Sequence, residues 1–382
     1  MLPRARPKRD ERLLTSRQGA ETPQNTGLRR AVERLVLLGA REVKLLGSLT
    51  PVDAHGERAR LVAAVEAGRE ACPRWRYAPV AHGDLRRALD AADRALAEEA
   101  ETPLDRLYHE RVRELSLEAE LCAAAGTAGL PHLARERFAA RDAAVARQAS
   151  LLCATWLDEP SHAAPAVTLA SDDDDPRSLL SRLRAEIGRL HLPFTVVTQP
   201  SLAPLAATGD GIILVAPGRR VTDEDAARTV LHEIEGHACP RARASEAPLA
   251  IFRAGTARGV DDQEGRALLL EERAGLLGPR RRRQLAARHR ACEAMADGAA
   301  FADVAPMLVR EHGLDALQAV VIAERIFRGG DGVHPGLGRE RVYLEALVRV
   351  RAHLEARPED EAVVAAGLVA VDAAPTLKAL LT

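Results

Sequence analysis

Residues 232–237 read HEIEGH and hold the side chains with the clearest catalytic potential in this 382-residue sequence. The common zinc-binding helix has the pattern HExxH, which places two histidines four residues apart on one helix face. Here the histidines are five residues apart, so an ideal α-helix would separate them by about 140°. A π-type turn would bring them back to within about 50° of each other. We therefore predict such a turn, with Gly236 permitting the distortion and leaving room beside a metal.

The chemistry predicted for this segment is metal-assisted hydrolysis. His232 and His237 are the predicted first two zinc ligands. Catalytic zinc takes three protein ligands and keeps one position open, so a third ligand is needed. Glu233 follows the first ligand, where a carboxylate can act as general base toward a metal-activated water. The alternative is an exposed helix that carries His and Glu by chance. A predicted strand and a strong helix start precede the motif, and this order favours an active-site helix.

The third ligand is expected on the next helix, which is predicted over residues 263–277. Glu264 is the first candidate, although spacing alone gives it only a modest preference. Glu271 and Glu272 are rivals about two turns further on, and we interpret them as acids that support the site or lie at the surface. Cys239 is a fourth candidate, interpreted as a small buried side chain.

The combination of HExxGH with a following helix that begins QEG resembles the tyrosine carboxypeptidase family. These are the QEGLA-motif proteins associated with flavohaemoglobin expression. The present chain reads QEGRA, so Arg266 replaces the family's leucine. Further segments are similar to family elements, and the likeness spans about residues 28–350; these segments are residues 45–58, 73–79, 120–127, 324–332 and 338–347. In residues 338–347, Arg339-Glu340 replaces the family's Lys-Asp. The substitutions at 266 and 339–340 therefore affect the expected side-chain specificity for substrate rather than the metal site.

The resemblance implies a zinc metallopeptidase with His232, His237 and Glu264 as ligands of Zn2+ and Glu233 as the base. Eukaryotic members of the family remove a C-terminal tyrosine from tubulin. For this chain we expect a carboxypeptidase whose substrate is the C-terminus of a peptide or protein. The family suggests that the residue removed is Tyr-like. Two other interpretations stay open: a regulatory or binding protein on an inactive peptidase scaffold, and a zinc amidohydrolase that acts on a small molecule. The intact HExxGH and QEG motifs favour an active enzyme.

Four side chains outside the motif are candidates for contact with the substrate. Tyr343 is predicted to donate a hydrogen bond to the oxyanion of the transition state, with His334 as an alternative. Arg325 and Arg328 lie three residues apart on one predicted helix face and are predicted to bind the substrate's terminal carboxylate. The predicted strand at 211–216 is expected to lie at a sheet edge and pair with the substrate backbone.

The pattern of apolar residues predicts an α+β fold that is predominantly helical. Helices are expected over residues 28–47, 56–70, 83–100, 103–125 and 177–190, and one or two more over residues 131–156. Thr222 and the acids after it predict another helix start. Only residues 193–199 and 211–217 have the β-branched content of strands. We expect a zincin-like metallopeptidase in which a small sheet covers the HExxGH helix.

The domain organisation is predicted from changes in composition along the chain. Residues 1–26 are expected to be a disordered tail and residues 27–157 a helical region. Residues 158–176, which contain three prolines and four consecutive aspartates, are a predicted linker. Residues 177–382 form the predicted catalytic region, and the alternative is that it packs with 27–157 as one compact unit. Within it, residues 239–262 are a candidate lid.

Composition excludes several classes of protein. Hydrophobic residues make up 47% and charged residues 29%, as in a folded protein, and no apolar run approaches the roughly 18 residues of a membrane span. A net charge of -1 and only 3% aromatic residues argue against nucleic acid or a membrane surface as partner. The five cysteines contain no CxxC pair, which indicates a reducing, cytoplasmic location. The strong preference for arginine over lysine is typical of a GC-rich bacterial genome.

Overall fold

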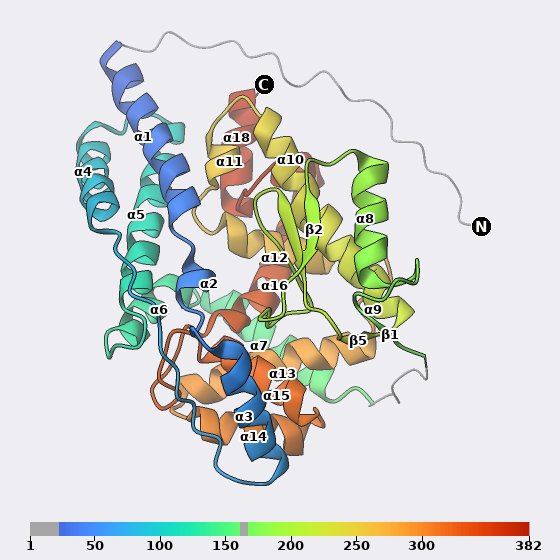
Figure 1. Cartoon of the computed structure of the whole chain (residues 1–382). Helices are drawn as coiled ribbons and strands as arrows, with labels where there is room; N and C mark the ends of the chain where they lie inside the picture. The colour runs from blue at the N-terminus through green and yellow to red at the C-terminus, as the bar shows by residue number, and fades with distance from the viewer. Residues whose placement is uncertain (1–22, 161–166, 382) are drawn as a thin grey trace.

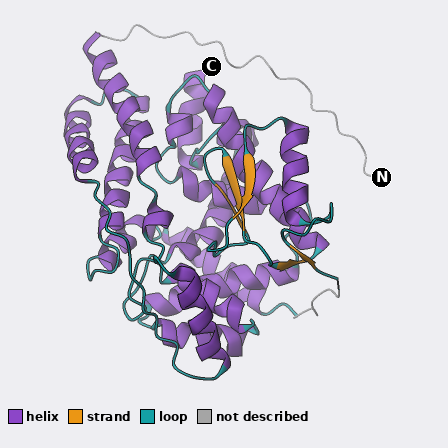
Figure 2. Ribbon diagram, viewed as in Figure 1, coloured by secondary structure: helices purple, strands orange, loops and turns teal. Residues whose placement is uncertain are grey.

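The computed structural model describes residues 23–160 and 167–381. Residues 1–22 of the predicted tail and residues 161–166 of the predicted linker lie outside the described residues. Residues 23–26, which we expected in the tail, begin the first helix. The described chain is predominantly helical with two small sheets, as the α+β prediction requires (Figure 2). Among the described helices, none is long and apolar enough to cross a lipid bilayer.

In the described part of the chain before residue 158 there are seven helices, at positions close to those that the periodicity predicts. They are α1 (Pro23–Glu42), α2 (Leu45–Ser48), α3 (Ala54–Glu66), α4 (Gly83–Glu99), α5 (Pro103–Ala123), α6 (Leu130–Phe138) and α7 (Ala143–Leu157). Residues 131–156, expected to form one or two helices, form two, because the Asp142 carboxylate caps the start of α7 by accepting from the backbone of Ala144 and Val145. Helices α1, α4 and α5 lie side by side at one side of the molecule (Figure 1).

A three-stranded sheet holds the two predicted strands and a third that was not predicted. Its order is β2 (Thr195–Thr198), β4 (Ile212–Val215), β3 (Ala206–Thr208), with β2 parallel and β3 antiparallel to β4. A two-stranded sheet pairs β1 (Leu169–Ala170) with β5 (Arg220–Val221). The strands that the sequence did not reveal have only two or three residues, too few for an alternating pattern. Helix α8 (Leu179–Leu190) packs beside β2.

One continuous helical run carries the HExxGH motif. It consists of α9 (Asp223–Leu231), the π-helix η1 (His232–Ala238) and α10 (Cys239–Glu246). The run begins as predicted, because Thr222 and Asp225 form a capping box and acids fill the first turn. The predicted π-type turn is confirmed, and it includes the whole motif.

The remaining helices follow closely along the chain. They are α11 (Ile251–Ala254), α12 (Gly259–Arg273), α13 (Pro279–Ala296), α14 (Phe301–His312), α15 (Ala316–Ile326), η2 (Arg339–Arg341), α16 (Val342–Ala356), η3 (Pro358–Asp360), α17 (Glu361–Val364), η4 (Val371–Ala373) and α18 (Ala374–Leu381). The candidate lid at 239–262 is therefore largely helical rather than a loop. Its residues Ile251 and Phe252 are buried in the main core, so this segment is anchored.

The largest hydrophobic core joins the N-terminal helices to the C-terminal half. Val36 of α1 and Leu115 of α5 belong to the same buried cluster as Leu268 of α12 and Leu347 of α16. Each fully buried leucine contributes about 1.5–3 kcal/mol relative to an exposed one. The N-terminal helices thus support the helices that carry the HExxGH and QEG motifs, whereas the domain boundaries stay a prediction.

Helices α12 and α16 approach so closely that one position requires glycine. A Cβ added at Gly265 would lie 2.4 Å from the backbone carbonyl atoms of Ala346 and 2.8 Å from its Cβ. Because backbone atoms cannot yield as a flexible side chain does, any larger residue would force the two helices apart.

We expect Gly265→Ala to lower the free energy of unfolding by about 1–3 kcal/mol through this overlap. Gly188→Ala is the matched control in α8, since a Cβ there meets nothing within 4 Å and removes a flexible residue from a helix. The control should raise stability by up to about 1 kcal/mol. Urea denaturation of both variants measures the difference, and equal effects would contradict the packing argument.

Candidate metal centre

The π-helix η1 and helix α12 bring three potential ligands together. The donor atoms of His232, His237 and Glu264 all lie within 4.8 Å of one another, the only such group of His, Cys, Asp or Glu side chains in residues 23–160 and 167–381. Glu264 Oε2 is 3.5 Å from His232 Nε2 and 3.7 Å from His237 Nε2. Ligands at about 2.0–2.1 Å from a tetrahedral zinc ion lie about 3.3 Å apart. The spacing therefore fits one shared ion.

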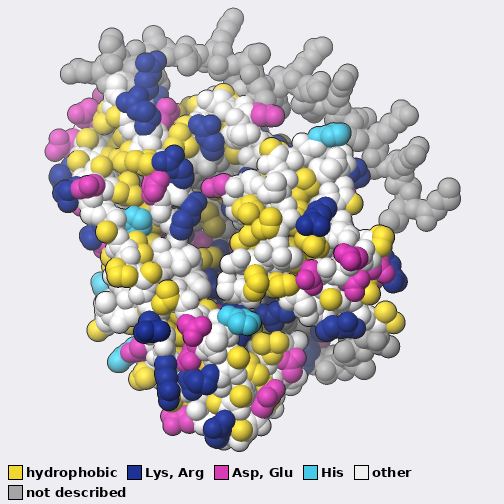
Figure 3. All heavy atoms as spheres, viewed as in Figure 1, with side chains coloured by type: hydrophobic (Ala, Val, Ile, Leu, Met, Phe, Trp, Pro, Cys, Tyr) yellow, Lys and Arg dark blue, Asp and Glu magenta, His cyan; other side chains and the backbone are white. Residues whose placement is uncertain are grey.

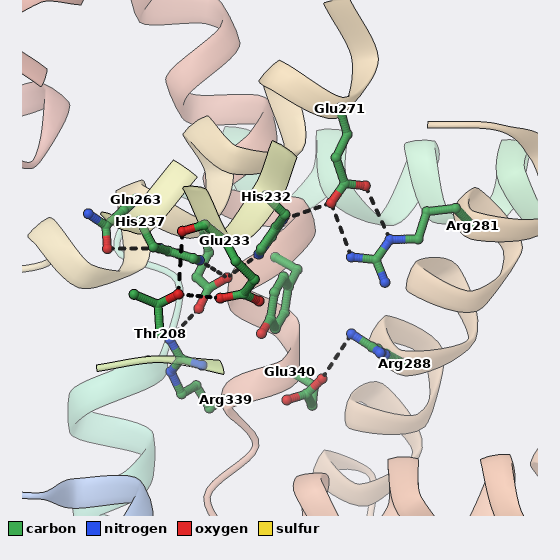
Figure 4. A network of polar contacts seen from close by, with 12 residues as sticks. Thr208, His232, Glu233, His237, Gln263, Glu271, Arg281, Arg288, Arg339 and Glu340 are labelled. Carbon is green, nitrogen blue, oxygen red and sulfur yellow. Dashed lines mark hydrogen bonds and ion pairs between the residues drawn. The ribbon is translucent and has the colours of Figure 1, made fainter. Parts of the chain in front are cut away.

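A hydrogen bond on the far nitrogen orients each imidazole. Nδ1 of His232 lies 2.7 Å from Glu271 Oε1, and Nδ1 of His237 lies 2.9 Å from Gln263 Oε1 (Figure 4). Arg241 donates to the same oxygen of Gln263, which identifies that atom as an acceptor. With protons on both Nδ1 atoms, each Nε2 lone pair is available toward Glu264, as in metal sites whose histidines are held by outer acceptors.

The buried charges of this centre favour a cation. Burial opposes charge on His232, but hydrogen bonds to Glu264 and Glu271 outweigh it and raise the pKa of this imidazole to about 9. Burial alone would also raise the pKa of Glu264, yet His232, His237 and Arg339 hold it well below its usual range. The pKa of His237 is lowered, chiefly by burial. The carboxylates thus stabilise positive charge at the place where a metal dication would lie.

Glu233 lies beside the potential ligands without belonging to them. The hydroxyl of Thr208 donates to Glu233 Oε2 at 2.7 Å and is 3.3 Å from the Glu233 backbone carbonyl (Figure 4). Thr208 is the last residue of β3, which packs against η1. Strand β3 therefore fixes the orientation of the predicted base. Sequence reasoning missed Thr208 because a three-residue strand leaves no recognisable pattern.

Each residue of the QEG motif has a separate physical role. Gln263 holds the ring of His237, Glu264 supplies the third donor atom, and Gly265 admits helix α16. Gly236 acts similarly, since a Cβ there would lie 2.7 Å from the Cβ of Ala267 on α12. We expected Gly236 to leave room beside a metal. In the structure Gly236 instead lets η1 approach α12.

The rival ligands have other positions. Glu271 is fully buried and accepts from His232 and Arg281, so it supports a histidine instead of joining the donor group. Glu272 is exposed and pairs with Arg351. Cys239 is buried, as interpreted from the sequence, and burial raises the pKa of its thiol to about 11. Its sulfur is not part of the donor group.

The four candidate substrate residues lie in different surroundings. Tyr343 is buried, and its hydroxyl accepts from Arg325 at 3.0 Å. Arg325 also donates to Glu340 at 2.9 Å, so its guanidinium is already engaged inside the protein. Arg328 makes no hydrogen bond or ion pair with its side chain among the described residues. The side chain of His334 is 67% exposed and pairs with Asp331.

The strand expected to bind substrate backbone does not lie at an edge. Residues 212–215 form β4, which is flanked by β2 on one side and by β3 on the other. Its backbone groups are therefore occupied within the sheet. The free edge nearest the HExxGH motif belongs to β3, because β3 is the strand that contacts η1.

Comparison with known families agrees with the site geometry. The description of the family whose model matches is "microtubule-associated tyrosine carboxypeptidase", and the match covers residues 65–382. The chain belongs to this family. The matched range contains the HExxGH run, the QEG helix and Tyr343, so the resemblance seen in the sequence is confirmed and the class of enzyme is a carboxypeptidase. No curated protein and no solved structure gives a significant match.

Arg266, which replaces the family's leucine, has a structural partner in this chain. In the π-helix the backbone N–H of Cys239 donates to the carbonyl of Ile234, five residues earlier. The next donor in this series would be residue 240, which is proline and has no N–H. Arg266 instead donates to the Glu235 carbonyl at 2.9 Å. The arginine thus replaces the hydrogen bond that Pro240 cannot make.

Arg266→Leu should lower the free energy of unfolding by about 1–3 kcal/mol, because the Glu235 carbonyl loses its donor. In a Pro240→Ala background the new backbone N–H can donate to that carbonyl, so the same substitution should cost less. A double-mutant cycle by urea denaturation measures this coupling. An identical loss in both backgrounds would show that Arg266 does not compensate for the proline.

Proposed function

We propose that this chain is a zinc-dependent carboxypeptidase that hydrolyses the last peptide bond of a peptide or protein. The observation that carries the proposal is the convergence of His232, His237 and Glu264 next to the oriented carboxylate of Glu233. Two imidazoles and one carboxylate form the donor set of many zinc peptidases. Membership in a carboxypeptidase family supports the same reaction, and the name of the family makes a C-terminal tyrosine the first residue to test.

The proposed mechanism assigns separate tasks to the side chains. A zinc ion bound at this site would lower the pKa of a coordinated water to about 7 and polarise the scissile carbonyl. Glu233, held by Thr208, accepts the proton of the attacking water and returns it to the leaving amine. Tyr343 accepts from Arg325, so its own proton is free to be donated to the substrate's carbonyl oxygen. Burial and the nearby Glu264 raise the pKa of Tyr343, which keeps it protonated.

The arrangement of the elements supports a zincin-like active site. The HExxGH helix lies under β3 at the edge of the small sheet, and the next helix, α12, supplies the third donor. An inactive scaffold would be expected to lack a ligand or the base, whereas all four residues are in place. Incubation of the protein with a peptide mixture, with products identified by mass spectrometry, distinguishes a peptidase from an amidohydrolase that acts on small molecules.

Glu233→Gln should retain zinc and lose turnover by a factor of about 10²–10⁴, because an amide cannot accept the proton. Glu235→Gln is the matched control, since it changes a glutamate of the same helix that lies outside the donor group. Steady-state kinetics and elemental analysis of both variants test the assignment. A Glu233→Gln variant that works at the parental rate would exclude Glu233 as the base.

Zinc content should be about one ion per chain, and it should fall strongly in Glu264→Gln, which removes an anionic ligand. Glu272→Gln lies two turns further along the same helix at an exposed position and should keep the ion. Treatment with a chelator should abolish hydrolysis, and added zinc should restore it. Equal zinc content in the two variants would show that Glu264 is not a ligand.

A further inference from the structure

The two carboxylate oxygens of Glu264 have different neighbours. Oε2 faces both imidazoles, at 3.5 Å from Nε2 of His232 and 3.7 Å from Nε2 of His237. Oε1 instead accepts a hydrogen bond at 3.2 Å from Nη2 of Arg339, which lies below the imidazoles in the view of Figure 4. One oxygen of the carboxylate is therefore directed toward the metal position, while an arginine holds the other.

A firmly anchored turn carries Arg339. This residue begins η2 and follows Gly338, whose φ of 62° lies in the left-handed region that favours glycine. The backbone N–H groups of Gly338 and Leu337 donate to the carbonyls of Ile326, at the end of α15, and of Arg328. The turn η2 also packs against α13, α15 and α16. The guanidinium of Arg339 is thus held in place by the fold on several sides.

Glu264 is the acid that compensates the charge of Arg339. Two other acids, Glu340 and Asp261, are each paired with a different arginine, at 2.9 and 2.7 Å. Arg339 is only 7% exposed, so water contributes little to its solvation, and a guanidinium does not lose its proton at ordinary pH. The hydrogen bond from Arg339 to Oε1 therefore joins two charged groups, which makes it stronger than a neutral one.

The position of Oε1 matters for the chemistry of the metal centre. A carboxylate can bind a metal ion through one oxygen or through both. Catalytic zinc has three protein ligands and keeps one further position open for water or substrate. If both oxygens of Glu264 turned toward the ion, the second one would compete for that open position. A hydrogen bond that holds Oε1 away from the ion opposes this competition.

We propose that Arg339 is a positioning residue that holds Oε1 of Glu264 and thereby limits this ligand to one oxygen. The inference rests on the proposed zinc-dependent function and specifies how that site keeps a coordination position open. Arg339 acts through Glu264 and needs no contact with substrate. Its role concerns the metal ligand, whereas the sequence analysis connected position 339 with side-chain specificity.

The test uses Arg339→Met, which removes the charged donor and keeps an unbranched side chain. The probe is Co2+ in place of zinc, because the visible d–d bands of cobalt weaken when a tetrahedral site gains a ligand. These bands should be weaker in the variant than in the parental protein, since Oε1 becomes free to join Oε2. In the zinc-loaded variant, kcat for a peptide that ends in tyrosine should fall about 10–100-fold while KM stays unchanged.

Two further variants separate the hydrogen bond from general effects on the fold. Arg339→Lys keeps a positively charged donor, so its bands and its kcat should lie between those of the parental protein and of Arg339→Met. Arg341→Met is the matched control, since Arg341 belongs to the same turn but pairs with Glu345 at 2.8 Å. It should match the parental protein in both measurements.

Circular dichroism of each variant verifies folding, and Arg339→Gln takes the place of Arg339→Met if the latter does not fold. The inference is overturned if the uncharged variant keeps the parental cobalt bands, or if it is folded but no longer binds cobalt. A parental chain that binds no cobalt would overturn both the inference and the proposed function. Failure of the proposed function alone would look different: the parental zinc-loaded chain would leave the peptide intact, although the cobalt bands still weakened in Arg339→Met.

Discussion

The close packing of η1 on α12, and of α12 on α16, is the constraint on which the rest of the structure depends. Gly236 faces Ala267 at the first contact, and Gly265 faces Ala346 at the second. Because these residues have almost no side chain, three helices can come within reach of one another. The first contact brings two imidazoles to Glu264, and the second brings Tyr343 of α16 toward the same place. Small residues therefore set the spacing of the chemical groups.

Charge pairing explains how so many ionised groups are buried around this packing. Glu271 is matched by Arg281, and Glu264 by Arg339, so that neither carboxylate is left alone in a medium that solvates it poorly. Around Tyr343 positive charge exceeds negative charge, because Arg288, Arg325 and Arg339 lie near its ring while Glu340 and Glu264 are the acids that pair with them. On the face of the molecule that Figure 3 shows, basic and acidic side chains are interspersed. The excess of positive charge around Tyr343 lies in the interior, because all three arginines are buried.

Local patterns in the sequence predicted the features that depend on neighbouring residues. The five-residue spacing of His232 and His237 predicted the π-type turn, and Thr222 predicted the start of its helix. Spacing did not single out Glu264 from its rivals, and the QEG resemblance was needed. The long helices were predicted because their apolar periodicity extends over many turns, whereas the breaks between them depend on single capping residues such as Asp142.

The features that were missed or wrong depend on contacts between distant segments. Thr208 reaches Glu233 from a strand of three residues, which has no periodicity to recognise. The strand predicted at 211–216 was expected at an edge, but it forms the central strand β4, because strand order is determined by tertiary packing. The pairing of Arg325 with Glu340 was missed because nothing in the helix of Arg325 reveals it, and the contact of Arg325 with substrate stays a prediction.

The most direct test of the central claim is a crystal structure with anomalous diffraction data collected on both sides of the zinc absorption edge. The account predicts one anomalous peak about 2.0–2.2 Å from His232 Nε2, His237 Nε2 and a carboxylate oxygen of Glu264. Crystals grown with zinc that show no peak there, or that show the two imidazoles turned away from each other, would contradict it.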